Sequence, residues 1–135
     1  MSGLKRLYTL LEIKMVDDYA REQETGHMEI EQDADLMTQF MKPTEMKLPA
    51  GAAATLVSMP LGATVIRFIG VKDVTSSEGL YLRIDAVDAD PILITPPDGV
   101  SKSGFFFMTT TASSLYADNP SATAEVEFQL MMGCT

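Results

Sequence analysis

The sequence predicts a mainly β protein: an antiparallel β-sandwich or barrel-like domain with an N-terminal arm that contains a short helix. In several short stretches apolar and polar residues alternate with a period of two, the period of a strand with one buried face. Proline and glycine separate these stretches at spacings of roughly 8–12 residues, as in sandwiches and barrels. No long helical pattern occurs among them. We therefore expect sheets to build the core.

Composition divides the chain near Pro49 into an N-terminal arm or docking segment, residues 1–49, and a β-sandwich domain, residues 50–135. The arm holds ten of the 19 acidic residues and six of the ten methionines. The second region holds seven of the nine glycines and five of the seven prolines, which are the residues that turns between strands require.

The start of the arm fits two structures, and the residues alone leave both open. A helix would place Leu4, Leu7, Leu11 and Met15 on one stripe, whereas a strand would place Thr9, Leu11, Ile13 and Met15 on one face.

The rest of the arm predicts three local structures. Residues 21–26 are polar and indicate a loop, and Met28 and Ile30 then alternate with acidic residues as in a short strand. Residues 33–41 indicate one helix that ends before Pro43. We expect this extended or partly swapped segment to pack on its own sheet or on a neighbouring subunit.

The second region predicts four strands before its last turn: residues 63–71, 79–85, 90–95 and 105–111. The stretch 79–85 alternates strictly, since Leu80, Leu82 and Ile84 share one face and Tyr81, Arg83 and Asp85 share the other. The run Pro96-Pro97-Asp98-Gly99 is a strong turn signal after the third strand.

The last stretch, SSLYADNPSATAEVEFQLMMG (residues 113–133), predicts a closing β-hairpin. Pro120 fits the first corner of a type I turn, with Asn119 before it and Ser121 after it. After the turn, Ala124, Val126, Phe128, Leu130 and Met132 face one way, and Glu125, Glu127 and Gln129 face water.

The charge and the apolar runs exclude several classes of protein. The formal net charge of −9 disfavours direct binding to nucleic acid or to an anionic membrane, which requires clustered Lys and Arg. The longest apolar runs, residues 50–57 and 105–108, are far shorter than the ~20 residues that span a bilayer. We expect no signal peptide, because Glu12 and Lys14 interrupt the N-terminal apolar run.

The residues that usually perform catalysis are scarce. His27 is the single histidine and lies in a polar segment, ETGHME, while Cys134 is the single cysteine and lies one residue from the chain end. The glycine-rich phosphate-binding motifs G-x-G-x-x-G and G-x-x-x-x-G-K do not occur, and there is no G-x-S-x-G motif. We expect no enzyme activity, no catalytic residues and no cofactor.

The best acidic cluster is formed by Asp85, Asp88 and Asp90. Three carboxylates so close in sequence could bind a hard cation such as calcium through oxygen. Their spacing, however, is not that of a D-x-D-x-D-G loop, so a solvated turn at a strand end is the favoured interpretation. We therefore expect no metal site.

The methionines indicate contact surface. Thioether side chains adapt to irregular packing and to partner surfaces, and ten methionines in 135 residues is a high content. The alternatives for those of the arm are packing within the chain and docking on a partner. The predicted interaction residues are Met28, Met37, Phe40, Met41 and Met46.

The segment GVSKSGFFFMTTTASSLYADNPSATAEVEFQLMMG (residues 99–133) resembles the C-terminal ends of small β-sandwich virion proteins of tailed bacteriophages. In those proteins an apolar strand continues into a Ser/Thr-rich strand, turns through an Asn-Pro-Ser-like corner and closes with an alternating strand. Residues 105–108, 109–115, 119–121 and 123–133 correspond to these parts. The resemblance covers the last third to half of the chain, and residues 1–49 do not contribute to it.

The resemblance implies a non-enzymatic structural subunit of a phage virion, a capsid decoration or cement protein or another minor capsid protein. The alternatives are a head–tail connector or tail component, or a β-sandwich module that binds sugar or calcium. The expected partners are further copies of the chain and virion proteins such as the major capsid protein, with no direct nucleic acid and no membrane. The expected location is the virion, after synthesis in the host cytoplasm.

Overall fold

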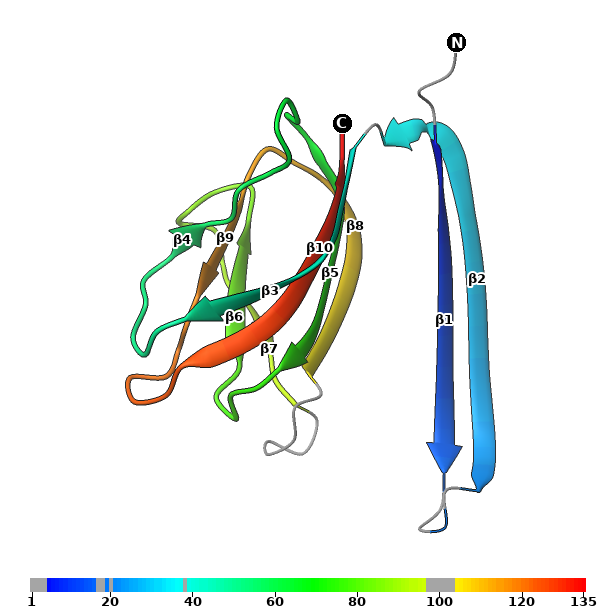
Figure 1. Cartoon of the computed structure of the whole chain (residues 1–135), viewed down its shortest axis with the longest axis horizontal. Coiled ribbons are helices and arrows are strands. Elements are labelled where there is room, and N and C mark those ends of the chain that lie inside the picture. The colour runs from blue at the N-terminus through cyan, green and yellow to red at the C-terminus, as the bar shows by residue number, and fades with distance from the viewer. Residues whose placement is uncertain (1–4, 17–18, 20, 38, 97–103) are drawn as a thin grey trace. The chain divides into compact units, whose positions relative to one another are not determined.

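The computed structural model describes residues 5–16, 19, 21–37, 39–96 and 104–135 (Figure 1). The chain divides into two compact units, Met1–Thr38 and Gln39–Thr135. The described residues form ten strands and no helix. All strand pairs are antiparallel, which confirms the prediction of a mainly β, antiparallel protein.

The first unit is one long hairpin of strands β1 (Lys5–Val16) and β2 (Glu22–Met37). The register places Leu11 opposite Met28, so Lys5–Val16 is a strand and not a helix; Leu4 of the alternative helical stripe lies outside the described residues. The loop predicted over residues 21–26 is wrong from Glu22 onward, because Glu22 pairs with Val16. Pairing with β1 satisfies the backbone groups of this polar segment that face β1, and these hydrogen bonds do not depend on the side chains.

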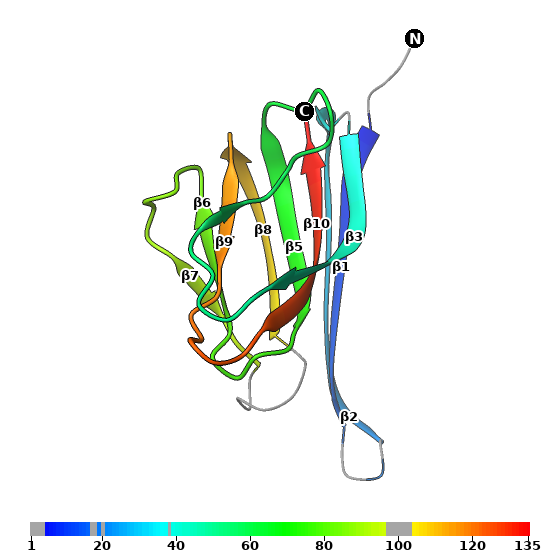
Figure 2. The same ribbon diagram turned by 60° about the vertical axis from the view of Figure 1, so that its left-hand side comes forward.

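The second unit consists of two four-stranded sheets (Figure 2). The first has the order β3-β10-β5-β8 and is called the β10 sheet; the second has the order β4-β9-β6-β7 and is called the β9 sheet. The strands of the β10 sheet are β3 (Gln39–Leu48), β10 (Val126–Cys134), β5 (Ile66–Val74) and β8 (Gly104–Ala112). Those of the β9 sheet are β4 (Thr55–Leu56), β9 (Leu115–Asp118), β6 (Leu80–Ile84) and β7 (Ile92–Ile94).

The four strands predicted between residues 63 and 111 are confirmed as β5, β6, β7 and β8, with ends shifted by up to three residues. In β6 the alternation holds, because Leu80 and Leu82 are buried and Tyr81 is partly exposed. Of the predicted turn at 96–99, residues 97–99 lie outside the described residues.

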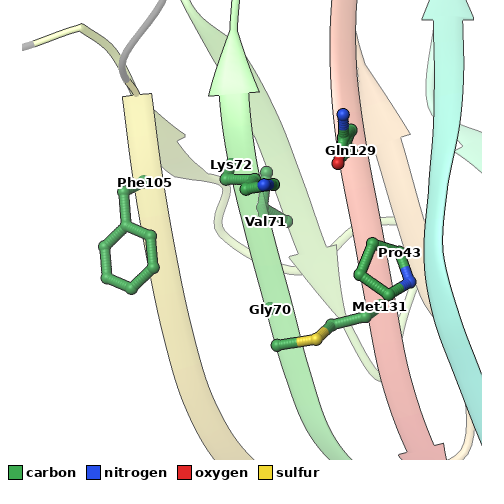
Figure 3. A pocket seen from close by; sticks show the side chains of 7 residues that line it. All are labelled: Pro43, Gly70, Val71, Lys72, Phe105, Gln129 and Met131. Atoms are coloured by element: carbon green, nitrogen blue, oxygen red, sulfur yellow. The ribbon is translucent and has the colours of Figure 1, made fainter. Parts of the chain in front are cut away.

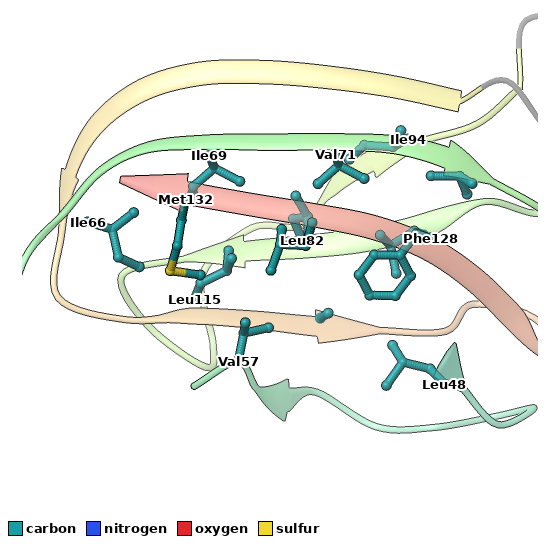
Figure 4. Close-up of a cluster of buried hydrophobic side chains, with 14 of the residues drawn as sticks. Leu48, Val57, Ile66, Ile69, Val71, Leu82, Ile94, Leu115, Phe128 and Met132 are labelled. Carbon is teal, nitrogen blue, oxygen red and sulfur yellow. The ribbon is translucent and has the colours of Figure 1, made fainter. Parts of the chain in front are cut away.

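One hydrophobic core lies between the inner faces of the two sheets (Figure 4). The β10 sheet contributes Ile69, Phe128 and Met132, and the β9 sheet contributes Leu82 and Leu115. These five side chains are almost completely buried. Their apolar burial is the main stabilising contribution to the second unit.

The helix predicted over residues 33–41 is wrong. Residues 33–37 end β2, and residues 39–41 begin β3, which pairs with β10. Composition shifts at Pro49, but the units divide after Thr38, so β3 belongs to the second unit. In β3, Met41 and Met46 pack against the core beside Leu48. These contacts with residues far away in sequence outweigh the local helix propensity.

The predicted closing hairpin is also wrong. β9 belongs to the β9 sheet and β10 to the β10 sheet, so the segment between them is an arch that passes from one sheet to the other. The buried Asn119 amide donates to the carbonyl oxygens of Leu48, Pro49 and Ala124, at 3.3, 3.0 and 2.8 Å. Its Oδ1 accepts a hydrogen bond from the Ser121 N–H at 3.0 Å. These side-chain bonds stabilise the arch, whereas the backbone ladder of a hairpin would have stabilised the predicted turn.

Candidate functional site

The outer face of the β10 sheet carries an apolar surface. The register places Gly70 beside Met131 on one side and beside Phe107 on the other. Successive side chains of a strand point to opposite faces, so these residues face away from the core residues Ile69 and Met132. We call this surface the outer apolar face; its members are Phe40, Pro43, Phe68, Gly70, Phe105, Phe107 and Met131.

Three phenylalanines form a row across this face. The ring centroid of Phe68 lies 5.9 Å from that of Phe40 and 5.7 Å from that of Phe107. Phe68 is only 2% exposed although it is not a member of the core between the sheets, whereas Phe40 is 51% exposed. The neighbouring rings therefore shield Phe68 from solvent, and the row forms an apolar cluster of its own.

A shallow depression of about 210 Å³ lies beside this row (Figure 3). The Met131 side chain extends from β10 across β5 at Gly70, where a Cβ atom would lie 2.7 Å from the Met131 Cε. Phe105 borders the depression on β8, and Lys72 and Gln129 supply polar groups at its border. The volume is below the roughly 300–1,000 Å³ of small-molecule pockets, so the surface suits a protein partner better than a small ligand.

Of the five predicted interaction residues, Phe40, Met41 and Met46 lie in the second unit, and these three do not share one surface. Phe40 lies on the outer apolar face, but Met41 and Met46 pack against the core. Met28 belongs to the hairpin unit, where it is 56% exposed. Met37 is the last residue of β2, and its side chain lies outside the described part of the structure.

The sequence interpretation missed Phe68, Phe105, Phe107 and Met131. A signal for them exists, because β5 and β8 carry apolar residues on both faces, unlike a strand with one face in water. In β10 the pair Met131-Met132 gives the same signal.

Asp85, the first residue of the acidic cluster after β6, is hydrogen-bonded by another residue of the chain. Asp85 Oδ1 accepts hydrogen bonds from the Ser113 N–H at 2.8 Å and from the Ser113 hydroxyl at 2.9 Å. These two bonds lower the pKa of Asp85, and the bond from the N–H has the larger effect. Arg83 Nη1 donates to the Ala89 carbonyl oxygen at 2.9 Å within the same turn. Among the described residues, no three or more His, Cys, Asp or Glu side chains are grouped so that they could hold a metal ion.

The two residues considered for catalysis have ordinary environments. His27 lies in β2 and not in a loop, and its Nε2 is 3.0 Å from Glu29 Oε1, with both side chains about half exposed. Cys134 is fully buried at the end of β10, and this burial raises the pKa of its thiol. A raised pKa opposes the thiolate form that a cysteine nucleophile needs.

Comparisons of the chain with protein-family models, with curated proteins and with solved structures found no match. No helix within the described ranges is long and apolar enough to cross a membrane. The geometry of the outer apolar face therefore carries the functional interpretation.

Proposed function

We propose that the chain is a non-enzymatic structural subunit of a phage virion, a capsid decoration or cement protein or another minor capsid protein. In this proposal Gln39–Thr135 is a β-sandwich whose outer apolar face docks on a virion protein such as the major capsid protein. The single observation that carries the proposal is an exposed apolar sheet face on a domain whose core is already complete.

Exposed phenylalanine supports docking through this face. Phe105 is 60% exposed and Phe40 is 51% exposed, and both border the buried Phe68 or the depression beside it. Contiguous apolar patches on a soluble domain mark interaction surfaces, and buried aromatic anchors contribute most of the affinity at such contacts.

The hairpin unit supports a second attachment. A single two-stranded hairpin is at best marginally stable in water, so β1 and β2 gain stability when another surface covers them. Residues 1–38 contain nine acidic and four basic residues, and the whole chain has a net charge of −9. This charge favours an outward position in the virion over one that lines packaged DNA.

The resemblance of residues 99–133 to virion proteins also supports a head–tail connector or a tail component. Both alternatives keep the docking face and differ in the partner. Asp85 is already bonded to Ser113, so we do not propose calcium or sugar binding at the acidic cluster.

The test is the mass of the purified protein by light scattering, alone and mixed with candidate capsid and tail proteins. We expect a stable complex with one of them, and we expect Met131→Glu to weaken it about tenfold or more, because a carboxylate would be buried in an apolar contact. The matched control is Leu93→Glu on β7, an exposed position of the β9 sheet, which should leave binding unchanged. A protein that binds none of the candidates contradicts the proposed function; equal binding by the Met131 variant contradicts the proposed face.

A further inference from the structure

The outer edges of the two sheets differ in their protection against strand addition. In the β9 sheet the edge strand β4 has two residues, and the edge strand β7 has three residues between Pro91 and Pro96. Edges this short offer too few free backbone groups to pair with another strand.

The edges of the β10 sheet are β3 and β8. β3 carries Lys42, Pro43, Glu45 and Lys47, and its register shifts opposite this segment. Charges, proline and bulges are the features that protect an edge strand. This edge is therefore protected.

β8 is unprotected. It spans nine residues without charge or proline, and within the described residues it pairs with β5 alone. Gly104 at its start is buried, and a Cβ atom there would lie 2.8 Å from the Val74 Cβ, whereas the next residue, Phe105, is exposed. Phe106 and Met108, which pack against the core, remain partly exposed at this edge. A long, uncharged and partly apolar edge is a template for pairing.

The sequence of β8 is complementary to itself. Residues 105–111 read Phe-Phe-Phe-Met-Thr-Thr-Thr, with a bulky half and a small half around Met108. An antiparallel pair of two such strands centred on Met108 places each phenylalanine opposite a threonine of the other copy. The resulting pairs are Phe105 with Thr111, Phe106 with Thr110 and Phe107 with Thr109. Aromatic and β-branched side chains directly opposite each other stabilise antiparallel pairs.

Charges on β8 itself do not oppose a second copy at this edge. Each chain has a net charge of −9, so two copies that approach through charged surfaces repel each other. β8 contributes no charge, and the pairing brings no like charges opposite each other.

We propose that β8 is the contact strand of a symmetric dimer, in which it pairs antiparallel with β8 of a second copy and joins two four-stranded β10 sheets into one sheet. The same strand serves both copies, as an isologous two-fold contact requires. The inference goes beyond the proposed function, because it concerns the edge of the sheet and not docking through its face.

The first test is the dimer dissociation constant of the full chain, measured by sedimentation. We expect Thr109→Lys to raise it about tenfold or more, since a charge on the edge opposes strand pairing. The matched control is Thr44→Lys on β3, which is also an exposed threonine but lies on the protected edge, and it should leave the constant unchanged. A monomeric wild-type chain, a dimer insensitive to Thr109→Lys, or equal effects of both variants would overturn the proposal.

The second test is disulfide cross-linking between copies that each carry one added cysteine at an exposed position, besides the buried Cys134. A mixture of Phe105→Cys and Thr111→Cys chains should form linked dimers, because the proposed register places these two positions opposite each other. Phe105→Cys alone should not, because the two copies of residue 105 would lie about 20 Å apart at a rise of about 3.4 Å per residue. Links in either variant alone, or none in the mixture, would contradict this register.

The two proposals fail separately. Loss of the dimer with retained binding to a capsid or tail protein overturns the β8 contact alone. A dimer with the expected cross-links that binds no virion protein supports the β8 contact and overturns the proposed function.

Discussion

Asn119 holds the arch between β9 and β10. The residue is 4% exposed, its amide donates to three carbonyl oxygens, and its Oδ1 accepts from the Ser121 N–H. Asn119→Ala would remove these four hydrogen bonds, and of the three carbonyl oxygens that of Pro49 would still accept a bond from the Ala52 N–H. We expect the free energy of unfolding to fall by about 2–4 kcal/mol, measured by denaturant titration.

The control for this change is Thr123→Ala, an exposed position in the same arch, where we expect a loss below about 0.5 kcal/mol. Asn119→Asp separates the two functions of the side chain, because it keeps the acceptor for Ser121 but has no donor for the carbonyl groups. Stability of Asn119→Ala equal to that of the Thr123 variant would show that the amide does not hold the arch.

Asp85 gives the fold a dependence on acid pH. The hydrogen bonds from Ser113 lower its pKa below the ordinary value of 3.8, so the ionised carboxylate stabilises the folded state above that value. This contribution is lost as the pH falls through the lowered folded pKa. We expect the wild type to be more stable than Asp85→Asn by a constant amount from neutral pH to about pH 5, and the difference to shrink below about pH 4.

The measurement is urea unfolding of both proteins over this range of pH. Ser113→Ala removes the hydroxyl donor and keeps the N–H donor, so its difference from Asp85→Asn should shrink in the same direction but by a smaller amount. A difference that widens in acid would contradict the direction of the Asp85 shift.

At the scale of the element, β10 places two adjacent methionines on opposite faces of its sheet. Met132 is fully buried in the core, whereas Met131 is partly exposed on the outer apolar face. We expect Met132→Ala to cost about 2–5 kcal/mol in the free energy of unfolding, because it leaves a cavity in the core. Met131→Ala should cost less than about 1 kcal/mol.

Each of these methionine variants is the control of the other, since chemistry and strand are the same. Denaturant titration measures both, and light scattering with the proposed capsid or tail partner gives the second readout. Equal destabilisation would mean that the outer apolar face is packed as tightly as the core.

The alternation of apolar and polar residues predicted the strands that have one buried face and one exposed face. β6 and the core face of β10 are read directly from residues 80–84 and 126–132. The helix predicted over 33–41 and the closing hairpin were wrong for one physical reason. In both places partners far away in sequence decide the structure: β10 beside β3, and the Leu48 carbonyl oxygen beside Asn119. Local propensity does not contain such partners.

The candidate site was predicted only at Phe40. The methionine cluster suggested that residues near it gather on one surface, but β3 turns Met41 and Met46 toward the core. Phe68 and Phe107 come together through the pairing of β5 with β8, which the sequence pattern does not specify. A search for strands that are apolar on both faces would have found them.

At the scale of the whole molecule, the core belongs to one unit. The described residues of the core cluster run from Met41 to Cys134, and all of them lie within Gln39–Thr135. The hairpin unit contributes none of these described members. Folding of the second unit and any attachment through β1 and β2 are therefore separable.

Truncated chains separate the two units. A chain of residues 39–135 keeps both four-stranded sheets and the whole described core, so we expect cooperative unfolding with a midpoint within about 3 °C of that of the full chain. A chain of residues 49–135 lacks β3, exposes the edge of β10 and loses Met41, Met46 and Leu48 from the core, so it should be less stable by about 3 kcal/mol or more. Calorimetry measures both. If residues 39–135 do not unfold cooperatively while the full chain does, the hairpin is required for folding. If they fold but do not bind a capsid or tail protein that the full chain binds, the hairpin serves attachment.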